Sequence, residues 1–317
     1  AGARAVLTER ASVDVPDGVA VLYVPNLQEA LDTIVPYFYD YPARSMRVIG
    51  ITGTNGKTTT SYLVRAILRH AGKRVGLIGT IQVMMEDEVF PTANTTPDVI
   101  VMQQLLAEMR TRGMDAVVME VSSHALDQGR VAGIEFDTAV FTNLTQDHLD
   151  YHKTMENYAR AKARLFDLVS EQGVKEGKTA ILNADDAAAK TMRAHTHCPL
   201  ITYGVDMPAD LTARKIRLGQ DGMELTIAYA GAELPAVQTG ITGLFNVNMW
   251  GFTGAFVGFP SFVNPKGIDS SFTGFWIASF AALVVAFLCT YFFGFSESDL
   301  EGGKEVKKVR LGKREPN

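Results

Sequence analysis

The chain has 317 residues, of which 47% are hydrophobic and 21% are charged, so it can bury at least one sizeable core and has room for two domains. This composition excludes an intrinsically disordered protein. The formal net charge of -5 and a pI near 5.7 exclude a globally basic surface, and we expect no nucleic-acid partner.

The two cysteines indicate the compartment. Cys198 and Cys289 lie far apart and in different surroundings, which favours a reducing environment over a disulfide framework. The first residue, Ala1, is not an initiator Met, and no signal-peptide pattern follows it, so we interpret the start as truncated. The predicted location is the cytoplasm.

Strands and helices alternate along most of the chain. A short apolar strand at 46–51 runs into a glycine-rich turn, and a helix with regular apolar spacing follows and ends at Gly72. The segment 203–237 alternates apolar and polar residues, which predicts added antiparallel strands. The remaining strands are expected within 74–80, 115–122, 136–144 and 178–185, and the remaining helices at 97–112 and 155–171.

Several predicted strands are apolar on both faces. Such runs are typical of a parallel sheet that helices cover on both sides. The predicted fold class is therefore α/β, with a mostly parallel sheet of phosphate-loop type, helices on both faces and an added C-terminal hydrophobic helix.

The stretch GITGTNGKTTT, Gly50 to Thr60, predicts a phosphate-binding loop between a strand and a helix. Ile51 stands where the common pattern has a glycine. Lys57 would pair with the β- and γ-phosphates of a nucleotide, and the Thr58 hydroxyl would face Mg²⁺. The residues predicted to contact the nucleotide here are Gly53, Thr54, Asn55, Gly56, Lys57, Thr58 and Thr59.

Three further segments carry polar residues of less specific meaning. Glu120 ends an apolar strand, where it could be an Mg²⁺ ligand or a solvated side chain. Lys162 lies on an amphipathic helix, and the residues alone predict a solvated lysine. The segment NLTQDHLDYH offers side chains that could bind a metal, cap a helix or be ordinary surface, namely Asp147, His148, Asp150 and His152.

Taken together and in this order, the segments resemble the Mur ligases, the ATP-dependent amide-bond-forming enzymes of peptidoglycan synthesis. The most similar type is the UDP-N-acetylmuramoyl-tripeptide synthetase (MurE type). The resemblance covers about 1–246 and rests on GITGTNGKTTT, TANTTPD, MEVSSHALDQGRV, FTNLTQDHLDYH and YARAKARLF. It implies an enzyme that uses ATP and Mg²⁺ to add diaminopimelate or lysine to UDP-MurNAc-L-Ala-D-Glu, as a monomer.

The resemblance also implies roles for single residues. Asn143 would contact the adenine side of ATP. Lys162 matches a lysine that the family carries as a carbamate, so the resemblance implies a functional Lys162 in place of a solvated one. A carbamate is an anion, which suits a group that orients a second Mg²⁺. The implied catalytic residues are Lys57, Glu120, His148 and Lys162, and the implied metal ligands are Thr58, Glu120, His148 and Lys162. The implied substrate residues are Asn94, Thr95, Thr96, Ser122, Gln128 and Arg130.

Two departures from the family shape the expected domains. We expect 1–44 to be the remnant of a UDP-binding domain and 45–248 to be the ATP-binding central domain. The family's third domain, which closes over ATP and selects the amino acid, is not recognisable after 248, so we expect the isolated chain to be unable to complete ligation.

The remaining segment, 249–317, resembles the end of a sugar phosphotransferase-system permease, less specifically. Its stretch 271–295 has no charge and at about 1.5 Å per residue would form a helix of about 37 Å, against about 30 Å for a bilayer core. We expect a foreign tail that can contact a membrane, joined near Asn248 by fusion or frameshift. The alternatives are a folylpolyglutamate-synthetase-like ligase and a membrane transport component that binds nucleotide.

Overall fold

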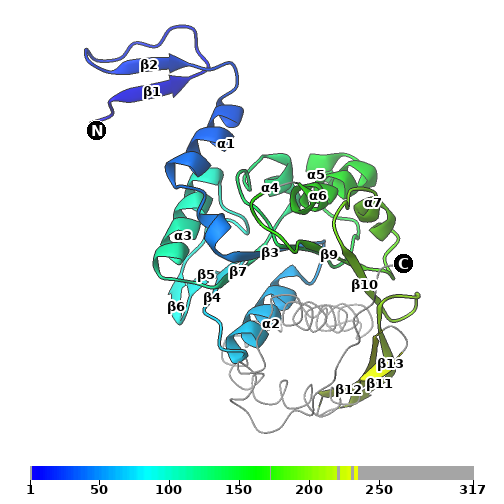
Figure 1. The fold of residues 1–317 in the computed structure, drawn as a ribbon. Coiled ribbons are helices and arrows are strands. Elements are labelled where there is room, and N and C mark those ends of the chain that lie inside the picture. The colour runs from blue at the N-terminus through cyan, green and yellow to red at the C-terminus, as the bar shows by residue number, and fades with distance from the viewer. Residues whose placement is uncertain (1, 172, 220–221, 230–231, 235–317) are drawn as a thin grey trace.

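The computed structural model describes 2–171, 173–219, 222–229 and 232–234 (Figure 1). The predicted junction near 248, the domain 249–317 and its hydrophobic helix lie outside the described residues. Within the described part, no helix combines the length and the apolar content that crossing a membrane requires.

Eleven of the described strands form one sheet in the order β13-β12-β11-β10-β9-β8-β3-β7-β4-β5-β6. The pairs from β4 through β7, β3, β8, β9 and β10 to β11 are parallel, and both ends of the sheet are antiparallel. The strands are β3 (Arg47–Thr52), β4 (Val75–Ile78), β5 (Val83–Met85), β6 (Glu88–Phe90), β7 (Ala116–Glu120), β8 (Thr138–Phe141), β9 (Thr179–Asn183), β10 (Leu200–Gly204), β11 (Leu211–Gly219), β12 (Gly222–Tyr229) and β13 (Ala232–Leu234).

Helices lie on both sides of the sheet, with α2 on one side and α6 and α7 on the other (Figure 1). The predicted α/β class, the mostly parallel sheet and its helical cover are confirmed. The helices are α1 (Leu27–Phe38), α2 (Lys57–His70), α3 (Val99–Thr111), α4 (Ser123–Asp127), α5 (Leu149–His152), α6 (Met155–Ser170) and α7 (Ala189–Ala194), with a 3₁₀ turn at Pro42–Ser45.

The strands alternate their side chains between two apolar layers. Val48 and Met119 belong to the core that also contains Phe166 of α6. Ile49 of β3 and Val118 of β7 lie opposite each other in the register, and both are fully buried. They belong to the other face of the sheet, where α2 packs against β3 and β7. Burial on both faces explains why these strands are continuously apolar.

Local signals set where the main helices begin. The Asp98 carboxylate accepts from the N–H groups of Ile100 and Val101, which caps α3. The Thr154 hydroxyl accepts from Asn157 N and caps α6 in the same way. Each cap satisfies backbone donors that have no partner inside the helix.

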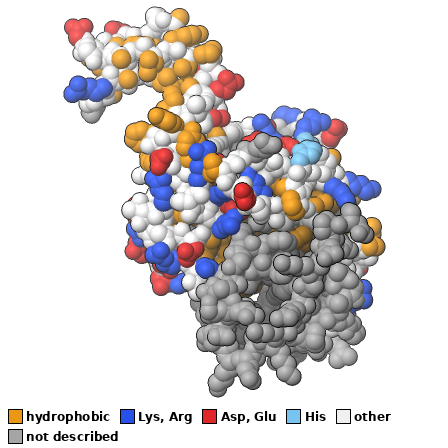
Figure 2. Space-filling view, in the orientation of Figure 1, with side chains coloured by type: hydrophobic (Ala, Val, Ile, Leu, Met, Phe, Trp, Pro, Cys, Tyr) orange, Lys and Arg blue, Asp and Glu red, His pale blue; other side chains and the backbone are white. Residues whose placement is uncertain are grey.

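The N-terminal part stands apart from this body. β1 (Ala5–Thr8) and β2 (Ala20–Tyr23) form a separate parallel pair, which α1 links to the main sheet (Figure 1). Hydrophobic side chains gather over this pair (Figure 2), and Val21, Leu22 and Tyr23 are exposed. The predicted boundary at 44 falls in the 3₁₀ turn between α1 and β3.

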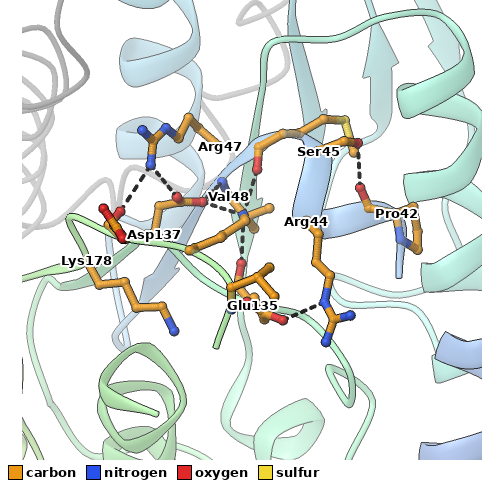
Figure 3. A network of polar contacts seen from close by, with 12 residues as sticks. Pro42, Arg44, Ser45, Arg47, Val48, Glu135, Asp137 and Lys178 are labelled. Atoms are coloured by element: carbon orange, nitrogen blue, oxygen red, sulfur yellow. Dashed lines mark hydrogen bonds and ion pairs between the residues drawn. The ribbon is translucent and has the colours of Figure 1, made fainter. Parts of the chain in front are cut away.

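A buried carboxylate joins the beginnings of β3 and β8 at the amino edge of the sheet (Figure 3). Asp137 is fully buried and accepts from Val48 N at 2.7 Å and from Arg47 Nη1 at 2.8 Å. Lys175 Nζ lies 2.5 Å from the same carboxylate and also donates to the carbonyl of Met46. This cluster fastens the loop before β9 to the start of the central strand.

Candidate functional site

The glycine-rich loop lies between the central strand β3 and helix α2, as predicted. Gly53 and Gly56 have φ of 150° and 86°, values that favour glycine. Asn143 accepts from Asn55 N through its side-chain oxygen at 2.9 Å and donates from its amide to Asn55 O at 3.0 Å. The residue predicted to contact adenine therefore also holds the backbone of this loop.

Replacing Gly53 with alanine tests how tightly the loop is built. A Cβ at Gly53 would lie 1.9 Å from Thr142 Oγ1, whereas a Cβ at Gly72, also at positive φ, meets nothing within 4 Å. We expect Gly53→Ala to lower the free energy of unfolding by about 2–5 kcal/mol, from overpacking plus backbone strain. Gly72→Ala should cost only about 1–2 kcal/mol of strain. Urea unfolding of both variants measures this, and equal losses would contradict it.

Two lysines meet at one carbonyl of the loop. Lys57 Nζ donates to Gly53 O and Thr54 O at 2.9 Å each, and Lys162 Nζ donates to the same Gly53 O at 2.9 Å. Lys162 is 1% exposed, and its ammonium lies 4.4 Å from the centre of the Tyr158 ring. Sequence reasoning from the helix alone predicted a solvated Lys162, which is wrong because α6 packs this face against the loop.

The two ammonium groups donate to carbonyl oxygens of the loop. Within the described ranges, neither forms an ion pair with a carboxylate. Burial lowers the pKa of Lys57, an effect that Glu120 and Asp147 partly offset. Burial and then the charge of Lys57 hold the pKa of Lys162 well below its ordinary value. An anionic ligand beside these lysines would stabilise their charged forms.

Glu120 ends β7 beside the loop and is fully buried, so it is not a solvated strand-end residue. Its Oε2 accepts from Thr58 Oγ1 at 2.9 Å and from Thr80 Oγ1 at 3.0 Å. Its Oε1 accepts from Thr80 N at 3.0 Å. The predicted pair Thr58 and Glu120 is thus brought together, and Thr80 joins it.

The predicted substrate residues form a second group next to Glu120. Thr96 Oγ1 donates to Glu120 O at 3.0 Å and accepts from Ser122 N at 3.1 Å. Arg130 donates to Thr96 O at 3.0 Å and to the side-chain oxygen of Gln128. Thr95 lies on the same segment and contacts Thr80, whereas Asn94 is exposed at its start.

The His148 side chain lies among other rings. His148 precedes α5 with a left-handed φ of 51°, and its ring contacts those of His124 and Tyr158. In the described part of the chain, no group of three or more His, Cys, Asp and Glu side chains is placed to hold a metal ion. Among the predicted metal ligands, Thr58 contacts Glu120, Lys162 donates to Gly53 O, and the His148 ring contacts the Tyr158 ring.

Sequence reasoning missed several residues of this region. Tyr158 stands four positions before Lys162 on α6, a spacing that could have indicated contact. His152, for which the sequence left a metal, cap or surface role open, is buried and shares a hydrogen bond of 2.9 Å with Ser123 Oγ. Burial lowers the pKa of His124 and of His152. No local signal indicated Thr80, because its partners are distant in the sequence.

Strand β3, the glycine-rich loop and α2 have the arrangement of a phosphate-loop α/β domain. The family profile described as the Mur ligase middle domain matches residues 51–249. The chain therefore belongs to the Mur ligase family and carries its middle domain.

Two relatives of known name carry the name of the same ligase. A protein of Geobacillus thermodenitrificans named UDP-N-acetylmuramoyl-L-alanyl-D-glutamate--2,6-diaminopimelate ligase is 44% identical over 248 residues, covering 78% of this chain and 50% of that protein. The protein of the same name from Bacillus cereus is 46% identical over 248 residues, again 78% of this chain and 50% of the relative. The chain spans about half the length of these curated relatives.

A solved structure of a ligase with that name has a TM-score of 0.61 and 28% sequence identity. The match covers 78% of this chain and 52% of the solved one. The predicted similarity to the MurE type is confirmed by these relatives.

Proposed function

We propose that this chain is the nucleotide-binding and UDP-substrate-binding part of an ATP-dependent ligase that adds 2,6-diaminopimelate to UDP-MurNAc-L-Ala-D-Glu in peptidoglycan synthesis. The observation that carries the proposal is the convergence of Lys57 and Lys162 on Gly53, beside the pair Thr58 and Glu120. The names of the relatives at 44% and 46% identity favour diaminopimelate over lysine as the added amino acid.

The proposed domain organisation follows the sequence boundaries. Residues 1–44 would belong to a UDP-binding domain, 45–248 would form the ATP-binding domain, and 249–317 would be an added tail. The proposed location of the ligase part is the cytoplasm, where ATP and a nucleotide-linked substrate are both available. A monomer without a nucleic-acid partner is proposed, and the negative net charge of -5 agrees with the second point.

The residues at the loop fit Mg²⁺. Thr58 and Glu120 present a hydroxyl and a carboxylate in direct contact at 2.9 Å, and such hard oxygen donors are the ones Mg²⁺ prefers. Bound there, Mg²⁺ would neutralise charge on the phosphates. His148 and Lys162 are the further proposed ligands. The lowered pKa of Lys162 supports its part, because the neutral amine is the form that adds CO₂ and releases a proton to become a carbamate.

The proposed reaction has two steps. The γ-phosphoryl group of ATP passes to the carboxylate oxygen of the D-Glu residue and ADP leaves. The amine of diaminopimelate then attacks the carbonyl carbon, phosphate departs, and the amine loses a proton. Lys57 neutralises the phosphates and orients them, and Asn143 holds the loop backbone in place, so the contribution of the chain is positioning and charge.

The test is the binding of both ligands by the chain, measured by calorimetry with a non-hydrolysable ATP analogue and UDP-MurNAc-L-Ala-D-Glu. We expect nucleotide binding to need Mg²⁺, and Glu120→Gln to weaken the Mg²⁺-dependent part about tenfold or more, because a neutral amide replaces a carboxylate. Glu156→Gln, at an exposed helix position, is the matched control.

Three outcomes would overturn the proposal. The first is a wild-type chain that binds neither ligand while it remains folded by circular dichroism. The second is binding of a folate in preference to the UDP substrate, which would favour the folylpolyglutamate-synthetase-like alternative. Binding of a sugar-phosphotransferase phosphodonor instead of ATP would point to the transport component.

A further inference from the structure

Thr80 contacts both Glu120, beside the phosphate loop, and Thr95, in the predicted substrate segment. It occupies the turn between β4 and β5, which Gly79 N closes by donating to Gln82 O at 3.2 Å. β4 runs parallel to β7, with Ile78 opposite Met119. The next residues of each strand, Gly79 and Glu120, therefore lie side by side, and a Cβ on Gly79 would be only 2.4 Å from Glu120 Oε1.

This placement lets one residue hold both oxygens of a buried carboxylate. Thr80 N donates to Glu120 Oε1 and Thr80 Oγ1 contacts Glu120 Oε2, both at 3.0 Å. Hydrogen bonds to an ionised acceptor are stronger than neutral ones, and two of them from one residue fix the carboxylate plane. The orientation of Glu120 toward Thr58 therefore depends on the turn before β5.

The same hydroxyl also reaches the predicted substrate segment. Thr80 Oγ1 lies 3.0 Å from Thr95 Oγ1. A hydroxyl has one proton, so Thr80 Oγ1 donates to Thr95 Oγ1 or to Glu120 Oε2, one of them at a time. The neighbour Thr96 donates to the main-chain carbonyl of Glu120. The segment with Thr95 and Thr96 therefore bonds directly to the main chain of Glu120 and contacts Thr80, which holds the Glu120 carboxylate.

From this chain of contacts we infer that Thr80 is a positioning residue that couples the UDP-substrate site to the Mg²⁺-nucleotide site. A ligand that orders Thr95 also orders the Thr80 hydroxyl and with it the Glu120 carboxylate. Coupling of this kind is reciprocal: each ligand raises the affinity for the other by the same factor. The inference rests on the proposed function, because that function assigns the two ligands.

The experiment measures the Kd of the Mg²⁺-ATP analogue with and without saturating UDP-MurNAc-L-Ala-D-Glu, on the full chain, and takes the ratio as the coupling. Thr80→Val keeps the backbone N–H and the shape but removes the hydroxyl, whereas Thr80→Ser keeps both donors. We expect the wild-type ratio to be about tenfold, the Ser variant to preserve it and the Val variant to reduce it to about one. Thr111→Val, an exposed hydroxyl on α3, is the control and should leave the ratio unchanged.

A second variant separates positioning from folding. Thr95→Val removes the other half of the hydroxyl pair, so it should abolish the coupling as Thr80→Val does, and the double variant should lose nothing more. If Thr80→Val lowers the melting temperature, Thr95→Val still tests the link.

Coupling that survives in Thr80→Val or Thr95→Val would overturn the inference, as would a wild-type ratio of one with both ligands bound. A wild-type chain that binds neither ligand overturns the proposed function instead, so the two failures are distinguishable.

Discussion

Lys57→Met is expected to weaken binding of the ATP analogue about 100-fold, the largest effect on binding among the substitutions considered. The Lys57 ammonium already lies within the loop, 2.9 Å from two of its carbonyl oxygens, so it needs little reorganisation to meet phosphate. The loss of a buried, charge-assisted contact of about 2–3 kcal/mol corresponds to roughly this factor. Calorimetric titration with the Mg²⁺-ATP analogue measures it.

The free energy of unfolding of Lys57→Met should stay the same or rise, although the variant binds the nucleotide less tightly. Burial lowers the pKa of Lys57, which means that the folded chain pays to keep this group charged. Methionine has a similar length and no charge, so the free energy of unfolding should not fall. Lys190→Met, at an exposed position of α7, should change neither quantity. A Lys57→Met variant that binds as the wild type does, or that loses binding only through unfolding, would contradict the prediction.

Asp137→Ala is expected to be the most destabilising of the substitutions, with a loss of about 3–5 kcal/mol in the free energy of unfolding. The Lys175 side chain is 6% exposed and the Asp137 side chain is fully buried, so alanine leaves a buried cation without its partner. Val48 N also loses the carboxylate that accepts its hydrogen bond at the start of β3 (Figure 3). Urea unfolding followed by circular dichroism measures the loss.

Two further variants make this result specific to the buried charge. Asp137→Asn keeps the size and one acceptor, so its loss should be smaller, about 2 kcal/mol. Glu156→Ala removes one partner of an exposed pair with Arg160 and should cost less than about 1 kcal/mol. Equal losses from Asp137→Ala and Glu156→Ala would show that the cluster around Asp137 does not stabilise the sheet.

The elements of the body could be predicted because their signals are local. The strand expected at 46–51 is β3 at Arg47–Thr52, and the helix expected at 155–171 is α6 at Met155–Ser170. Thr154 and Asp98 are caps that the sequence displays directly. The short β5–β6 hairpin was not predicted, since three-residue strands carry no periodicity.

The antiparallel strands expected at 203–237 are confirmed for β11, β12 and β13. The preceding strand β10 differs, because it pairs in parallel with β9 and with β11. Alternation of apolar and polar residues shows that a strand is half-buried, but the direction of its neighbour is a property of the whole sheet.

Within the site, only the phosphate loop could be predicted from a local sequence pattern. The sequence alone was sufficient to identify the loop from Gly53 to Lys57, because glycines at positive φ followed by Lys-Thr act within one turn of chain. The resemblance to a family added Lys162 and the substrate segment. The roles assigned to the individual residues stay predictions until binding is measured.

Only the tertiary structure decided which of these residues touch. Lys162 reaches Gly53 across 109 positions and Thr80 reaches Glu120 across 40, through the packing of α6 and the parallel register of β4 with β7. The sequence by itself determined the main strands and helices and the phosphate-loop motif, since these depend on neighbours within a few residues. Contacts between distant segments depend on strand order and on burial from the opposite side, which no local pattern encodes.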